Sequence, residues 1–205
     1  MPGRTRRPQD HFGERAKREG YPARSVYKLQ EIDRRLQLLR RGQRVLDLGA
    51  APGSWTQFAA QRVGREGKVV SIDLNPARVA LPPHVTFQTL DIFKLDALGE
   101  LGASAFEVVL SDMAPHTSGQ RHRDQFGSFE LYMRALEIAG QVLVPGGAFV
   151  GKIFQGPEME GARDQTRAHF ESVRIIKPEA SRSESFEIFI VGMGARPSPP
   201  PSAAD

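Results

Sequence analysis

Cysteine is absent from the 205-residue sequence, and its absence removes several kinds of chemistry. Without thiols the chain forms no disulfide, no cysteine-ligated zinc site and no iron–sulfur cluster, and it has no cysteine nucleophile. The composition therefore excludes radical reactions that start at a cluster and alkylation of a base through a cysteine adduct.

Long apolar runs are also absent. No stretch approaches the roughly 18–20 apolar residues that a membrane-spanning helix needs. The first 20 residues are rich in charge and no apolar segment follows them, so they do not have the pattern of a secretory signal. We therefore expect a cytoplasmic protein with no membrane contact.

The composition is that of a folded chain, because 40% of the residues are hydrophobic and can form a substantial core. The length predicts one domain with short appendages. We expect a flexible basic N-terminal arm over 1–20, a single domain over 21–194 and a disordered Pro-rich tail over 195–205. We also expect the protein to act as a monomer.

Positive charge is concentrated at the N-terminal end. Residues 1–44 carry 13 Lys and Arg against 5 Asp and Glu, whereas the other 161 residues carry 15 against 19. A basic segment joined to a mildly acidic body indicates a polyanionic partner. Phosphates attract Lys and Arg regardless of base identity, so the asymmetry favours a nucleic acid, although basic termini can also serve only solubility.

Short apolar runs alternate with helical patterns along most of the chain. Strands are expected over 44–49, 68–74, 85–91, 106–112, 148–154, 171–177 and 186–192, and helices over 25–39, 55–63, 125–143 and 158–170. This alternation predicts an α/β fold with a mostly parallel, doubly wound sheet. The last two runs have no helix between them, which predicts an antiparallel hairpin.

The local signals at two of these elements are specific. Ser25 can cap the first helix, whose apolar face would run to about Leu39. The sequence PGG at 145–147 is a stop signal before the fifth strand.

A glycine turn follows the first expected strand in VLDLGAAPGSW (45–55). Small residues let the backbone approach a ligand there, and the start of the next helix offers free N–H groups. Asp73 lies 24 residues after Gly49, a spacing typical of a carboxylate that binds ribose hydroxyls. Asp91 and Asp112 end the next two strands, so three carboxylates would gather where open α/β sheets bind ligands.

This pattern favours an adenosine-containing ligand, although a single Asp after a strand is often only a turn former. The phosphate-binding motif G-x-x-x-x-G-K-[ST] is missing, and so is the G-x-S-x-G motif of hydrolases. Carboxylates attract a cation, so a ligand with a sulfonium and an amino acid moiety fits better than a dinucleotide does.

Two charged residues interrupt apolar strands near the C-terminus. Lys152 alternates onto the same face as Val150, and Glu187 lies in FEIFIVG. A buried lysine is costly unless it is paired or lies at the open end of a strand. With Asp112 and Lys28 these residues form a candidate cluster of two acids and two bases, provided that the sheet order brings them together.

The five histidines form no metal-binding or deaminase pattern. His116 and His122 lie in sequence near the proposed site, where a contact to nucleic acid is one interpretation and a solvated loop is the other.

Five segments together carry a family resemblance: RSVYKLQEID (24–33), VLDLGAAPGSW (45–55), SDMAPHTSG (111–119), GKIFQG (151–156) and SFEIFIVG (185–192). They resemble the FtsJ/RrmJ (RlmE) family of S-adenosylmethionine-dependent ribosomal RNA 2′-O-ribose methyltransferases. The resemblance covers nearly the whole chain, from about residue 11 to 197. One departure is Ser54, where bacterial members usually have a second Gly.

The resemblance implies a Rossmann-like sheet of seven strands, mostly parallel with an antiparallel last strand, and helices on both faces. It implies S-adenosylmethionine as the methyl donor and no metal. The residues that would bind the donor are Gly53, Trp55, Asp73, Asp91 and Asp112. It places a catalytic tetrad on Lys28, Asp112, Lys152 and Glu187. The implied substrate is a uridine of large-subunit (23S) ribosomal RNA in the assembled or assembling subunit, contacted by the basic N-terminal region.

Three alternatives stay open at this point. Family members in other lineages modify tRNA or mRNA caps. A non-catalytic RNA-binding or assembly factor could use the same scaffold, although Lys152, Asp112 and Asp73 are all present here. A dehydrogenase is the third alternative, and the absence of G-x-G-x-x-G argues against it.

Overall fold

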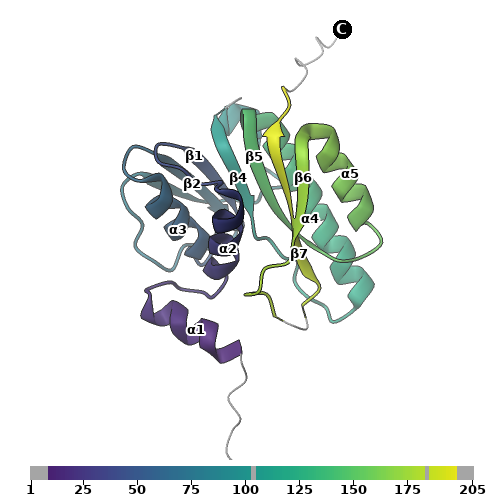
Figure 1. The fold of residues 1–205 in the computed structure, drawn as a ribbon, viewed down its shortest axis with the longest axis horizontal. Helices are drawn as coiled ribbons and strands as arrows, with labels where there is room; N and C mark the ends of the chain where they lie inside the picture. The colour runs from purple at the N-terminus through teal and green to yellow at the C-terminus, as the bar shows by residue number, and fades with distance from the viewer. Residues whose placement is uncertain (1–8, 103–104, 183–184, 198–205) are drawn as a thin grey trace, which may run out of the picture.

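The computed structural model describes residues 9–102, 105–182 and 185–197. Seven strands form one sheet in the order β3-β2-β1-β4-β5-β7-β6 (Figure 1). The strands are β1 (Arg44–Leu48), β2 (Lys68–Asp73), β3 (Val85–Thr89), β4 (Phe106–Ser111), β5 (Leu143–Phe154), β6 (Phe170–Ile176) and β7 (Glu187–Ala195). Strand β7 is antiparallel to both of its neighbours, and the pairings among β1 to β5 are parallel. The predicted fold class is confirmed.

Central strands are apolar because both faces of the sheet are covered. In β1, every residue from Val45 to Leu48 is buried, including Asp47. Helices α2 (Val26–Leu36) and α3 (Ser54–Val63) pack on one face, where Trp55 and Phe189 belong to one core cluster. Helices α4 (Arg121–Val142) and α5 (Met159–His169) pack on the other face (Figure 1), where Tyr132 and Phe149 belong to a second cluster.

The N-terminal segment differs from the expectation. Residues Gln9–Arg18 form helix α1, so the prediction of a flexible arm over 1–20 was wrong for this part. Ala16 is buried, and it clusters with Tyr21, Tyr27 and Ala180 from the body of the protein. The mean hydropathy of the segment is low, so its sequence did not indicate that residues such as Ala16 would pack against the body of the protein. Residues 1–8 lie outside the described residues.

Helix α2 also departs from the prediction. It ends at Leu36 because Gln37 adopts a left-handed conformation with φ 52°. Ser25 makes no side-chain cap; its main-chain oxygen instead accepts hydrogen bonds from Lys28 N and from Trp55 Nε1. Past the helix end, Asp33 Oδ1 accepts the N–H of Leu39 and holds the chain that leads to β1.

Two further details were not expected. Strand β5 begins at Leu143 and runs through the PGG sequence, where its pairing with β4 shifts register between Phe106 and Val108. A short π-helix, η1, spans Ala97–Leu101.

The sheet extends into the segment assigned to the tail. Ala195 is the last residue of β7, and Arg196 N donates to His169 O. Residues 198–205, the rest of the predicted tail, lie outside the described residues. Within the part of the chain that the structure describes, no helix is long and apolar enough to span a membrane.

Candidate active site

A cavity of ≈ 410 Å³ opens where strands β1 to β4 end. Its lining includes Gly49 after β1, Asp73 at the end of β2, Asp91 after β3 and Asp112 after β4. Parallel strands end at the same edge of a sheet, so one Asp per strand produces an acidic rim. The structure therefore brings together the three carboxylates that the sequence placed at a ligand site.

Apolar side chains complete the cavity, and sequence reasoning missed them. Leu74 and Phe93 are 64% and 56% exposed, unusual for large apolar residues, and both line the cavity together with Met113. Each follows one of the three aspartates by one or two positions, which is the signal that could have identified them. Exposed apolar walls beside carboxylates suit an aromatic base joined to a ribose.

The carboxylates at the cavity are partly held by the backbone. Asp73 Oδ2 accepts the N–H of Ala51 at 2.9 Å, and its Oδ1 accepts the N–H of Asn75 at 2.7 Å. Asp91 Oδ1 accepts the N–H of Phe93 at 3.0 Å. These bonds fix the orientation of both carboxylates, so that ligand binding requires little reorganisation.

The glycine turn makes room for the cavity. Gly49 has φ +76°, and a Cβ there would lie 2.3 Å from Met113 Cγ, so only glycine lets β1 turn against the segment after β4. Gly53 has φ +113° and would place a Cβ 2.7 Å from Val79 Cγ2. The Ala51–Pro52 peptide bond between them is cis.

Gly53 and Trp55 do not line this cavity. Trp55 is 3% exposed, and its indole N–H donates to the main-chain oxygen of Ser25 at 2.8 Å. Ser54, the departure from the family pattern, is buried, and its Oγ bonds both the N–H and the C=O of Ala23. The start of α3 therefore anchors the segment that leads into α2.

Lys152 lies beside Asp112 at the end of the cavity nearest β5. Its Nζ donates to the main-chain oxygen of Asp112 at 2.6 Å and lies 2.9 Å from Oδ1 of the same residue. The Lys152 side chain is 7% exposed. A nearly buried ammonium needs such paired oxygens to offset the loss of hydration.

Lys28 reaches the same cluster from α2. Its Nζ lies 2.6 Å from Glu187 Oε1 and 3.9 Å from Asp112 Oδ1. It also lies 5.9 Å from the centre of the Phe189 ring. All four residues of the predicted tetrad, Lys28, Asp112, Lys152 and Glu187, are thus joined by ion pairs.

Asp112 links the tetrad to the cavity, because it lines the cavity and faces both ammonium groups. Its Oδ1 is buried and, among the described residues, accepts no hydrogen bond of good geometry although Lys152 Nζ is close. An ammonium held 2.9 Å from this oxygen can bind and orient a hydroxyl group that reaches Asp112 from the cavity.

Asp47 is a buried carboxylate that sequence reasoning missed. Burial in β1, together with the nearby charges of Asp112 and Asp73, raises its pKa to about 7, although a hydrogen bond from Thr56 opposes the increase. Thr56 Oγ1 donates to Asp47 Oδ2 at 2.7 Å, while Oδ1 has no partner among the described residues. This acid lies beneath the site rather than in it.

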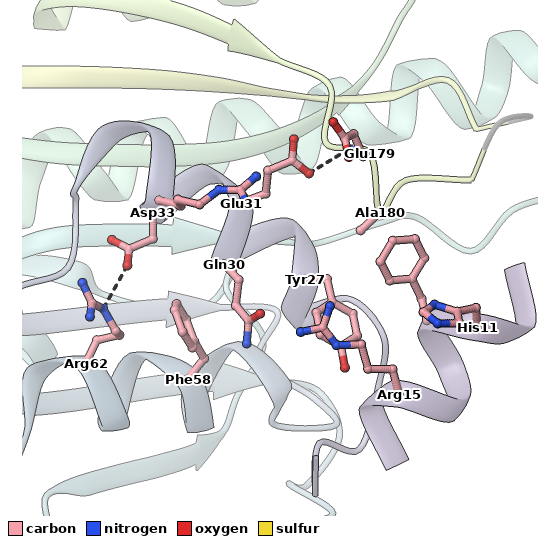
Figure 2. Close-up of a pocket in the computed structure, with 12 residues that line it drawn as sticks. His11, Arg15, Tyr27, Gln30, Glu31, Asp33, Phe58, Arg62, Glu179 and Ala180 are labelled. Atoms are coloured by element: carbon pink, nitrogen blue, oxygen red, sulfur yellow. Dashed lines mark hydrogen bonds and ion pairs between the residues drawn. The ribbon is translucent and has the colours of Figure 1, made fainter. Parts of the chain in front are cut away.

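A hollow of ≈ 670 Å³, larger than this cavity, lies elsewhere, between α1, α2 and α3 (Figure 2). Its charges balance, since it is lined by Arg15, Arg34 and Arg62 and by Glu31, Asp33 and Glu179. Arg62 pairs with Asp33 at 2.9 Å, and the Arg15 guanidinium lies 4.6 Å from the centre of the Tyr27 ring. No tetrad residue lines it, so it is a gap beside α1 and not part of the active site.

The described residues include no group of three or more His, Asp or Glu side chains that could hold a metal ion.

Comparison with known proteins decides the family. The model of the FtsJ-like methyltransferases matches residues 21–195. The chain belongs to this family. It is an S-adenosylmethionine-dependent methyltransferase.

Curated relatives match over nearly their full length. The chain is 54% identical over 186 residues to the ribosomal RNA large subunit methyltransferase E of Sorangium cellulosum, covering 90% of this chain and 87% of the relative. It is 50% identical to the protein of the same name from Nitratidesulfovibrio vulgaris, covering 92% and 95%. A crystal structure from Plasmodium falciparum, described as a ribosomal RNA methyltransferase, matches with a TM-score of 0.74 at 25% identity, covering 85% of this chain and 98% of that one.

Proposed function

We propose that this protein transfers a methyl group from S-adenosylmethionine to the ribose 2′-oxygen of a uridine in 23S ribosomal RNA, within the assembled or assembling large subunit. One observation carries the proposal: two nearly buried lysines and two acids form an ion-paired tetrad at the mouth of the cavity, with Asp112 shared between tetrad and cavity. A hydroxyl group needs such an arrangement of bases and cations to lose its proton.

The donor fits the cavity by chemistry. Asp73 would accept hydrogen bonds from the ribose hydroxyls, and Asp91 would bind the adenosine end between Leu74 and Phe93. Asp112 would face the cationic part of the donor. Gly53 and Trp55 would act by shaping the turn and anchoring α2. When bound, the donor supplies an electrophilic sulfonium methyl group.

Lys152 would orient the 2′-hydroxyl. It would also either accept the hydroxyl proton or stabilise the negative charge that develops on the oxygen as the proton leaves. Its own position is fixed by two oxygens of Asp112, at 2.6 and 2.9 Å. Lys28 and Glu187 would hold Asp112 and the substrate side of the site in place through their 2.6 Å ion pair. Much of the rate enhancement would come from this fixed geometry.

The substrate assignment is supported by the names of the relatives, which act on ribosomal RNA of the large subunit, and by charge. Residues 1–44 carry an excess of eight positive charges, 13 against 5, suited to a phosphate backbone. We propose that this basic N-terminal region contacts the RNA. Activity would not need a second chain, because one chain supplies both cavity and tetrad, so the protein would act as a monomer. An enzyme that modifies ribosomal subunits would work in the cytoplasm.

The test uses large ribosomal subunits from cells that lack this protein. Incubation with the purified enzyme and labelled S-adenosylmethionine should add label to a uridine 2′-oxygen of 23S RNA, recognised because the following phosphodiester bond resists alkali. Transfer RNA and free 23S RNA serve as competing substrates. Label on a base, or preferential labelling of tRNA, would contradict the proposal.

A further inference from the structure

The cavity proposed for the donor covers one half of the sheet edge at which the parallel strands end. The RNA would therefore approach over the other half of this edge. The cavity lies over the ends of β1 to β4, and the tetrad follows at β4, β5 and β7. Beyond the tetrad, an exposed aromatic side chain stands directly before Glu187. Phe186 is 47% exposed, an unusual position for a phenyl ring.

This ring is covered by a cation from another element. The Arg121 guanidinium, at the start of α4, lies 4.2 Å from the centre of the Phe186 ring. The main chain beneath is fixed, because Phe186 O accepts the N–H of Gln155 at 2.8 Å at the end of β5. Gln125 from α4 in turn donates to Gln155 O. Hydrogen bonds therefore join the segment that carries Phe186, the end of β5 and helix α4, which carries Arg121.

A hollow of ≈ 390 Å³ adjoins this pair. It is lined by Arg121, His122, Gln125, Gln155, Gly156 and Pro157. The lining contains a guanidinium, an imidazole and two amides but no carboxylate, so it suits a neutral polar ring next to phosphates and not a cation.

We propose that Phe186 and Arg121 form a stacking site for an unpaired nucleobase of the substrate RNA, either the target base or its neighbour. This inference rests on the proposed function and names the RNA feature that the site would bind. Proteins that recognise unpaired RNA stack its bases on aromatic rings and guanidinium planes and bind their edges with polar side chains. Here the ring adjoins Glu187 in sequence, so a stacked base would keep its ribose close to the tetrad.

The test measures methyl transfer to large subunits with Phe186→Ala, Phe186→Tyr and Arg121→Ala. Loss of stacking should raise the KM for RNA in Phe186→Ala roughly tenfold or more. The dissociation constant for S-adenosylmethionine should stay unchanged, because neither residue lines the donor cavity. Phe186→Tyr should retain the wild-type KM. The Phe186→Ala, Arg121→Ala double variant should be little worse than the Phe186→Ala variant, since the two residues act as one unit.

Salt dependence separates stacking from phosphate binding. Phe186→Ala removes no charge, so the slope of RNA affinity against salt should remain that of the wild type. The matched control is Ile175→Ala, which removes another exposed apolar side chain, 45% exposed, on the edge strand β6. It should leave the KM unchanged.

Several results would overturn the inference: an RNA KM for Phe186→Ala within twofold of wild type, an equal change in Ile175→Ala, or failure of Phe186→Tyr to retain affinity. If the wild-type enzyme methylates no ribosomal RNA at all, the proposed function itself fails. If the wild type methylates the RNA and Phe186→Ala does so with unchanged KM, only the stacking site is wrong.

Discussion

Lys152 holds Asp112 by two oxygens at once, donating to its main-chain oxygen at 2.6 Å while lying 2.9 Å from its carboxylate. The main-chain bond fixes the ammonium even when the carboxylate is engaged elsewhere. A hydroxyl group that engages the carboxylate would therefore not displace the lysine.

Replacing Lys152 by Ala should abolish methyl transfer while the fold and the donor site persist. We expect the rate of transfer to fall by about 100-fold or more, the usual contribution of a positioned acid–base group. Single-turnover transfer to large subunits measures the loss, and calorimetry measures donor binding. Lys68→Ala is the control, because Lys68 is exposed at the opposite edge, where β2 begins. Transfer at the wild-type rate by the Lys152 variant would exclude the role assigned to this residue.

The tetrad was predictable because each member is a charged residue in, or at the end of, an apolar pattern. Lys152 and Glu187 interrupt strands, and charges in such places need partners. That they meet depends on β7 lying next to β5, with Phe154 opposite Glu187. Sequence alone indicated the antiparallel hairpin of the last strands but could not place β7 between β5 and β6.

Two other features were not predicted from the sequence. Helix α1 is polar along most of its length, and its position depends on contacts of Ala16 with distant residues such as Ala180. The exposed walls Leu74 and Phe93 break the rule that large apolar residues are buried. They become meaningful only when the strand order places them around one cavity.

Lys28 and Glu187 should act as a coupled pair. Both are nearly buried, and removal of one partner leaves an unpaired charge, which is strongly destabilising. We expect Lys28→Met and Glu187→Gln each to lower the free energy of unfolding and the methyl-transfer rate. The double variant should be less destabilised than the sum of the two, with a coupling of about 1 kcal/mol or more.

Chemical denaturation of the wild type, the two single variants and the double variant gives the coupling energy. The exposed pair Arg15–Glu19, with an ion-pair distance of 2.7 Å and side chains 41% and 33% exposed, is the control, and its coupling should be much smaller. Additive effects of Lys28→Met and Glu187→Gln would show that the 2.6 Å contact contributes nothing to the fold.

Phe93 should bind the donor. Phe93→Ala removes a wall of the cavity, so we expect the dissociation constant for S-adenosylmethionine to rise roughly tenfold, in line with the burial of an aromatic surface. The KM for RNA should not change. Phe126→Ala provides the comparison, because Phe126 is 51% exposed, close to the 56% of Phe93, and does not line the cavity. Equal effects of the two substitutions on donor binding would contradict the assignment.

The basic N-terminal region should contribute salt-dependent RNA affinity. Because α1 packs on the body, deletion of residues 1–20 would also remove buried Ala16, so the clean change is substitution of Arg4, Arg6 and Arg7 by Ser. Each lost phosphate contact should lower the slope of log affinity against log salt by about 0.7–0.9. Binding to 23S RNA across a salt series measures the slope. A slope equal to that of the wild type would show that these three arginines do not touch phosphate.

Asp47 should make stability depend on pH near neutrality. Burial raises its pKa to about 7 in the folded protein, whereas the unfolded chain loses this proton near about pH 3.9. Between these values the native state binds more protons than the unfolded state, so the free energy of unfolding falls as pH rises through the interval. The cost is absent below about pH 4 and complete above about pH 7.

Asp47→Asn removes this titration. Relative to wild type, the variant should therefore gain stability between about pH 5 and pH 8, by up to about 4 kcal/mol for a shift of this size. Thermal unfolding of both proteins across this range measures the difference. Asp164→Asn serves as the comparison at an exposed carboxylate, because this side chain is 61% exposed. A constant gap between wild type and Asp47→Asn at all pH values would mean that Asp47 stays charged beneath the site, and its negative charge would then act on the donor throughout.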